Sequence, residues 1–191
     1  MATVKLSDSN LVSGWNSKMD FPKDNYTLRC LEEEIKPSKN GHPMVHLTWE
    51  ICRNEPVQFG NKLIDVDGLK IEQYILTKHK KEDGPNGTIV WDAEKSAKAL
   101  GRYCTVLRNC GFDLEQEIDD ENPPSFFKGK VVDAVVYARK DVSRKSPTAE
   151  QAKKGLPGDV IKDPFGKEVA TYQLQVDQIF GLSSVDTNKL Y

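Results

Sequence analysis

The chain has 191 residues, of which 38% are hydrophobic and 29% charged, and its formal net charge is -2. This length suffices for one well-buried core and is short for two, so we expect a single main domain. The balanced charge excludes the global basic excess of histone-like proteins and polybasic membrane binders, so an anionic partner must meet a local patch.

A β-hairpin is predicted after an N-terminal lead-in, residues 1–24, that shows no clear period. The run NYTLRCLEEEIKPSKNGHPMVHLTWEICR begins at Asn25 and carries Pro, Ser, Asn and Gly between Lys36 and Pro43, which is turn chemistry. The second strand alternates cleanly, and we expect its buried face to consist of Val45, Leu47, Trp49 and Ile51. Trp49 is then a core residue.

A third strand is predicted over residues 69–80, LKIEQYILTKHK, after a segment, 54–67, that is typical of a loop or a short irregular strand. Its alternation places Tyr74 on a solvated face together with Lys70 and Lys78. The following KKEDGPNGT has the composition of a flexible turn.

One amphipathic helix is predicted between Asp92, a good N-cap, and Gly111, which suits a left-handed C-cap. Apolar residues recur at helical spacing, so the helix should pack against a sheet. The stripe consists of Ala93, Ala97, Leu100, Tyr103, Cys104, Leu107 and Cys110.

Two further strands follow an acidic run at 113–121, which holds six acidic residues and no basic one. The first covers about 130–142 and buries Val132, Ala134, Val136 and Ala138. The second, within VATYQLQVDQIFGL, returns after a polar segment, 143–168, whose spaced Pro and Gly indicate a long and mobile loop. The chain ends in a tail, residues 183–191.

The resulting order predicts a mainly β protein with a five-stranded, OB-fold-like Greek-key barrel over residues 25–182. One α-helix lies between strands three and four, where it closes a barrel end, and the long loop lies between strands four and five.

A family resemblance agrees with this fold. The run FPKDNYTLRCLEEEIKPSKNGHPMVHLTWEI, followed by a helix ending LRNCGFD, resembles small phage-encoded proteins with a K-x-s-K-N-G-x-P hairpin, whose tip matches Lys39, Asn40 and Gly41. The resemblance extends loosely over residues 20–182 and concerns fold more than chemistry. Members are regarded as OB-fold single-stranded DNA-binding proteins of phage replication and recombination. The resemblance therefore implies single-stranded DNA as partner, with phage replication or recombination proteins as further partners.

Locally basic, aromatic-bearing strands favour the same function, since cations meet phosphates and flat side chains stack on bases. Residues 128–154 carry eight basic and three acidic residues, a net of five positive charges in a chain of net charge -2. The predicted DNA-binding residues are Lys36, Lys39, Lys70, Tyr74, Lys78, Phe127, Lys128, Lys130, Tyr137, Arg139, Lys140, Arg144 and Lys145. Either Phe126 or Phe127 is expected to pack instead.

Other readings stay open. A phage structural or assembly protein without nucleic-acid affinity would share this composition, and the carboxylates of EQEIDDE are a conceivable magnesium site of a nuclease. If the acidic run holds no metal, we expect it to be a loop that repels DNA or a strip on which a protein docks. The tail, SSVDTNKLY, differs from the acidic tail with which bacterial single-strand binders recruit partners.

No catalytic signature is found, so we expect no enzyme activity, cofactor or metal. Cys30, Cys52, Cys104 and Cys110 show no zinc-ligand spacing and are interpreted as reduced, mostly buried thiols. Without a predicted membrane span or a signal-peptide pattern at the N-terminus, we expect a soluble cytoplasmic protein, in the host cell if phage-encoded. Self-association is left open.

Overall fold

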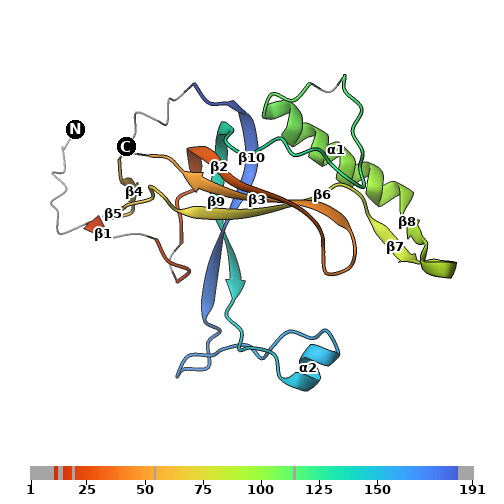
Figure 1. The fold of residues 1–191 in the computed structure, drawn as a ribbon. Helices are drawn as coiled ribbons and strands as arrows, with labels where there is room; N and C mark the ends of the chain where they lie inside the picture. The colour runs from red at the N-terminus through yellow and green to blue at the C-terminus, as the bar shows by residue number, and fades with distance from the viewer. Residues whose placement is uncertain (1–10, 13–14, 19, 54, 114, 185–191) are drawn as a thin grey trace.

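The computed structural model describes residues 11–12, 15–18, 20–53, 55–113 and 115–184. Its main element is a five-stranded antiparallel sheet in the order β10 (Ala170–Leu182), β9 (Val131–Val142), β2 (Asp24–Pro37), β3 (Pro43–Ile51) and β6 (Lys70–Leu76). One long helix, α1 (Ala93–Asn109), packs against both β6 and β10 (Figure 1). The prediction of a mainly β chain with one helix after the third of these strands is therefore confirmed.

The sheet is open. Its edge strands, β6 and β10, come into contact with each other, but within the described residues they are not paired by hydrogen bonds. Of the predicted OB-fold-like barrel, the described residues therefore show the five-stranded antiparallel sheet and the helix, and they form no closed barrel. The seam between β6 and β10 is covered by α1 instead.

The core lies on one face of this sheet, as the alternation in β3 predicted. Val45, Leu47, Trp49 and Ile51 have no exposed surface, and the indole N–H of Trp49 donates to the side-chain oxygen of Gln73 at 2.7 Å. The cysteines are free thiols, buried except for the half-buried Cys104.

The helix is capped as predicted. The carboxylate of Asp92 accepts the Lys95 N–H at 3.0 Å, and the Phe112 N–H donates to the Leu107 carbonyl at 2.9 Å past Gly111, whose φ is +83°. Tyr103, Leu107 and Cys110 are buried, but Ala93 and Ala97 are exposed, contrary to the prediction. Ser96 is buried in their place because its hydroxyl accepts the His79 N–H at 3.0 Å.

Two small sheets complete the described fold. In one, β5 (Lys62–Ile64) pairs in parallel with β1 (Leu11–Val12) and antiparallel with β4 (Val57–Phe59). In the other, β7 (Lys80–Asp83) pairs with β8 (Ile89–Trp91) around a 3₁₀ turn at Pro85–Gly87. The strand predicted at 69–80 is observed as β6, which ends at Leu76, and β7 begins only at Lys80. No described helix has the length and apolarity of a membrane span.

The chain ends are described only in part. Of the predicted lead-in, Phe21 is buried in the core and its ring meets that of Trp15 edge-on. Residues 1–10, 13–14 and 19 of the lead-in, and 185–191 of the predicted tail, lie outside the described residues.

The long connection between β9 and β10, residues 143–169, forms a separate limb, here called the arm (Figure 1). The predicted long loop at 143–168 contains local structure: the helix α2 (Ala149–Lys153) and backbone hydrogen bonds such as Lys145 N–H to the Asp159 carbonyl at 2.8 Å. Gly158 is required there, since a Cβ atom would lie 1.9 Å from the Lys145 carbonyl oxygen.

Glu33 on β2 holds the turn before β9. Its carboxylate accepts the backbone N–H groups of Phe126, Phe127 and Lys128 at 2.8–3.2 Å and the Ser125 hydroxyl at 3.0 Å. Several donors on one carboxylate fix a backbone segment strongly.

We therefore expect Glu33→Ala to lower the free energy of unfolding by about 2 kcal/mol, because buried donors lose a charged acceptor. Urea denaturation measures the effect. Glu32→Ala is the matched control, since Glu32 is the exposed neighbour and should change stability little. Equal effects of the two substitutions would contradict this role for Glu33.

Candidate nucleic-acid interface

Tyr74 is displayed on the outer face of the sheet. It lies opposite His46 across the β3–β6 pair, and the two rings are stacked with centroids 4.4 Å apart and planes 5° apart. His46 in turn contacts Glu72 through Nε2 and Glu34 through Nδ1. The His46 ring therefore supports one face of Tyr74, while 56% of the tyrosine stays exposed.

A hollow of about 550 Å³ lies beside Tyr74 at the β2–β3 turn; we name it the hairpin groove. It brings together three of the predicted residues, Lys36, Lys39 and Tyr74, with Met44 and Leu76 as apolar neighbours. Lys39 is exposed, whereas Lys36 forms an ion pair with Glu34. This contact lowers the pKa of Glu34, so its carboxylate is ionised at neutral pH.

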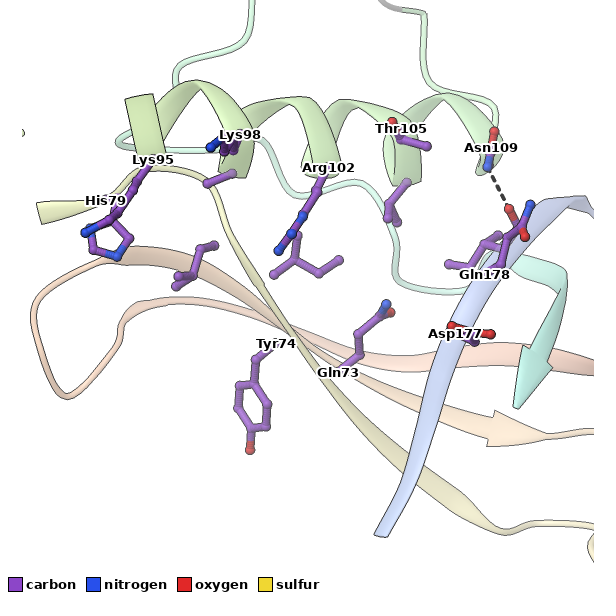
Figure 2. A pocket seen from close by; sticks show the side chains of 15 residues that line it. Gln73, Tyr74, His79, Lys95, Lys98, Arg102, Thr105, Asn109, Asp177 and Gln178 are labelled. Atoms are coloured by element: carbon purple, nitrogen blue, oxygen red, sulfur yellow. Dashed lines mark hydrogen bonds between the residues drawn. The ribbon is translucent and has the colours of Figure 1, made fainter. Parts of the chain in front are cut away.

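A second hollow, of about 790 Å³, lies between α1, β6 and β10; we name it the helix groove (Figure 2). Tyr74 borders this hollow as well. Three cations from α1, Lys95, Lys98 and Arg102, line it, together with polar groups of β6 and β10 such as Gln73 and Gln178. These helix cations are not among the DNA-binding residues predicted from the sequence.

The three cations differ in their partners. Lys98 is paired with Glu94 at 2.6 Å and Lys95 with Asp92 at 3.3 Å. Both lysine side chains are more than 60% exposed, so these pairs are weak and exchangeable. Arg102 has no ion pair within the described part of the chain, and Figure 2 shows its side chain extending from α1 toward β6.

Lys78 is held by the acidic run. Its ammonium group contacts Asp120 at 3.0 Å and Glu121 at 2.8 Å and lies 4.8 Å from the centre of the Trp91 ring. Desolvation opposes the shift, but the hydrogen bonds with Glu121 and Asp120 raise the pKa of Lys78. This predicted DNA contact is therefore already neutralised by carboxylates.

Phe127 was predicted wrongly as a DNA contact. It has no exposed surface and packs in the core, where its ring meets those of Tyr103 and Phe126 edge-on, so it cannot stack on a base. Lys128 is exposed beside it, and the ammonium of Lys130 lies over the Phe126 ring at 4.3 Å. The expectation that one of the two phenylalanines packs is confirmed.

The remaining predicted residues lie apart from Tyr74. Lys70 is exposed at the other end of β6, opposite Glu50, which is paired with Arg29 at 2.6 Å. Tyr137 is half-buried on β9 and donates its hydroxyl to Gln175 at 2.9 Å. A further set is exposed where β9 leads into the arm: Arg139, Lys140, Arg144 and Lys145.

The register explains this separation. β9 pairs with β2 only up to Val136, opposite Asp24, and beyond that point it pairs with β10 alone. The arm therefore begins beyond the N-terminal end of β2, whereas the hairpin groove lies at its C-terminal end. The predicted residues therefore form no continuous patch, and those of the hairpin groove and those at the start of the arm lie at opposite ends of β2.

Carboxylates between these groups were missed by the sequence reasoning. Cross-strand pairing puts Glu34 and Glu72 on the same face as Tyr74, on either side of His46. The bulge between Cys30 and Glu32 shifts the alternation along β2. Without knowledge of this bulge, the sequence does not show which face of the sheet carries Glu34. Across the described residues, no group of three or more His, Cys, Asp or Glu side chains is arranged to hold a metal ion.

Comparison with known proteins finds no match among protein-family models, curated proteins or solved structures. The resemblance to phage single-stranded DNA-binding proteins therefore stays a prediction from sequence motifs.

His42 lines the hairpin groove and is sensitive to protonation. Its Nδ1 accepts the Lys80 N–H at 2.9 Å, and its ring lies 4.1 Å from that of His79. Burial, with the positive charges of His79, Lys80 and Lys95, lowers the pKa of His42 from its usual 6.5. The folded state thus favours the neutral ring.

We expect the free energy of unfolding to decrease as the pH falls below about 6.5, because the unfolded chain then binds a proton that folded His42 does not. In His42→Asn this part of the decrease should be absent. Urea denaturation between pH 7 and pH 5 measures the difference between the two proteins. Identical pH dependence in both would exclude His42 as the group responsible.

Proposed function

We propose that this protein binds single-stranded DNA with little sequence preference, through an OB-fold-like sheet, as a component of phage replication or recombination. The order of the five strands supports the fold assignment. In chain order they are arranged 5-4-1-2-3, with the helix between the third and fourth, and a partly open Greek-key barrel has this arrangement. Strands two and three of such barrels carry oligonucleotide-binding faces; here they are β3 and β6.

The observation that carries the proposal is the position of Tyr74. It is an exposed ring beside the hairpin groove, which Lys36 and Lys39 line. Figure 2 shows the ring pointing from β6 away from α1, so the three helix cations lie on the other side of β6. A base stacked on Tyr74 has a neighbouring phosphate that lies toward Lys36 and Lys39. Stacking on an aromatic ring with phosphate contacts beside it is the usual way of binding single strands without reading their sequence.

His46 makes Tyr74 more suitable for stacking. Because the imidazole covers one face of the phenol ring and is held by Glu34 and Glu72, the tyrosine loses little conformational freedom when a base covers its other face. The same carboxylates repel phosphate, so the phosphates of the bound strand lie over the hairpin groove and not over the centre of the β3 face.

The proposal is tested by titrating the protein into a labelled thirty-base oligothymidine and following fluorescence anisotropy at several salt concentrations. Each neutralised phosphate contributes about 0.7 to the slope of log affinity against log salt. Tyr74→Ala should weaken binding roughly five- to thirtyfold without changing this slope, because a stacking contact is lost. Lys36→Ala with Lys39→Ala should weaken binding and lower the slope by about 1.4.

Lys62→Ala is the control, since Lys62 is an exposed lysine on β5, away from both grooves. Its effect on affinity at moderate salt should be small. Self-association without any affinity for the oligonucleotide would favour a structural or assembly protein instead. Affinity that is independent of salt would contradict the proposed phosphate contacts.

The contact of Lys78 with the acidic run predicts a further effect on DNA binding. Replacing Asp120 by Asn and Glu121 by Gln should strengthen binding to the oligonucleotide, because Lys78 is released to meet a phosphate. The salt slope should increase by about 0.7. The matched control is Glu115→Gln with Glu117→Gln, which removes two charges from the same run at exposed residues that do not contact Lys78. Equal gains in affinity for both variants, with unchanged slopes, would show general repulsion and not release of Lys78.

A further inference from the structure

The tip of the arm displays one large apolar side chain, Phe165, which is 95% exposed. Among the large apolar side chains described as exposed, Tyr74 follows at 56%. Single exposed apolar side chains are common on protein surfaces, so the role of Phe165 is argued from the turn that carries it and the charges beside it.

The backbone that carries Phe165 is rigidly arranged. The carboxylate of Asp163 accepts the N–H groups of Phe165 and Lys167, both at 2.9 Å, and the Asp163 N–H donates to the Lys167 carbonyl at 2.8 Å. Pro164 precedes the ring, and Gly166 adopts the positive φ of +80° that the turn needs. The turn therefore presents the ring outward at little further cost in backbone entropy on binding.

The surroundings of Phe165 favour nucleic acid over a protein partner. Residues 162–168 contain no other large apolar side chain, whereas a protein interface is built around a cluster of them. Lys162 and Lys167 flank the ring, both exposed and without an ion pair within the described residues. A single ring between two available cations matches one base with its neighbouring phosphates.

We propose that Phe165 is a second base-stacking residue, and that Lys162 and Lys167 contact the phosphates on either side of the stacked base. This inference rests on the proposed binding of single-stranded DNA and adds a contact on a separate limb from Tyr74. The rest of the arm adds to the positive charge around this contact, since residues 143–169 hold six basic and four acidic side chains. One strand is then bound at two points, on the sheet and on the arm.

The test compares Phe165→Ala, Phe165→Leu and Phe165→Trp with the wild-type protein by fluorescence anisotropy, using thirty-base oligothymidine and an abasic strand of the same length. The alanine and leucine variants should bind oligothymidine about five- to thirtyfold more weakly, with unchanged salt slope, and tryptophan should restore binding. On the abasic strand all four proteins should bind alike, because no base is there to stack. Since Phe165 is exposed, these substitutions leave the core intact.

Wild-type affinity of Phe165→Ala for oligothymidine would overturn the inference and leave the proposed function standing. So would an equal loss on the abasic strand, which would indicate altered phosphate contacts. If the wild-type protein dimerises in sedimentation experiments and Phe165→Ala does not, with unchanged DNA affinity, the ring is a contact between copies. No binding of oligothymidine by the wild-type protein would instead refute the proposed function itself.

Discussion

Strand β2 is hydrogen-bonded to both β9 and β3, and the curvature of the sheet depends on which residues of β2 pair with each of them. Its first half pairs with β9 from Asp24 to Arg29, and its second part pairs with β3 from Leu28 to Pro37. The bulge between Cys30 and Glu32 follows this short overlap, and a bulge bends a strand and increases its twist. The sheet therefore curves at this point, which accounts for the contact between its edge strands, β6 and β10.

Curvature without closure creates the helix groove. Because β6 and β10 meet without a hydrogen-bonded ladder in the described residues, α1 packs over their seam and leaves the helix groove between the three elements. The buried residues of α1 are Ser96, Tyr103 and Leu107. Its cations, Lys95, Lys98 and Arg102, therefore remain accessible beside the seam between β6 and β10. The cations thus line the helix groove because the described sheet does not close.

The features that the sequence predicted are those encoded by local periodicity. Alternation in β3 and β6 identified the core face and the exposure of Tyr74, and Asp92 and Gly111 marked the ends of the helix. Features that depend on contacts between residues far apart in the chain could not be predicted from the sequence. The hydrogen bonds that order the arm join residues near 145 to residues near 159, and Phe127 is buried by a turn that Glu33 holds from 94 residues away. Phe165 did carry a signal, since a phenylalanine inside a charged turn has no core to enter.

The charge pattern indicates how an acidic chain can bind an anion. Three of the cations that line the two grooves, Lys36, Lys95 and Lys98, are paired with carboxylates only a few residues away. Exposed pairs of this kind contribute little stability, so a phosphate that replaces the carboxylate loses little in the exchange. The displaced carboxylates stay close by, however, and limit the affinity gained per contact. Stacking on neutral rings is free of this competition, so in this protein the aromatic contacts should carry a larger share of the affinity than they do in a strongly basic binder.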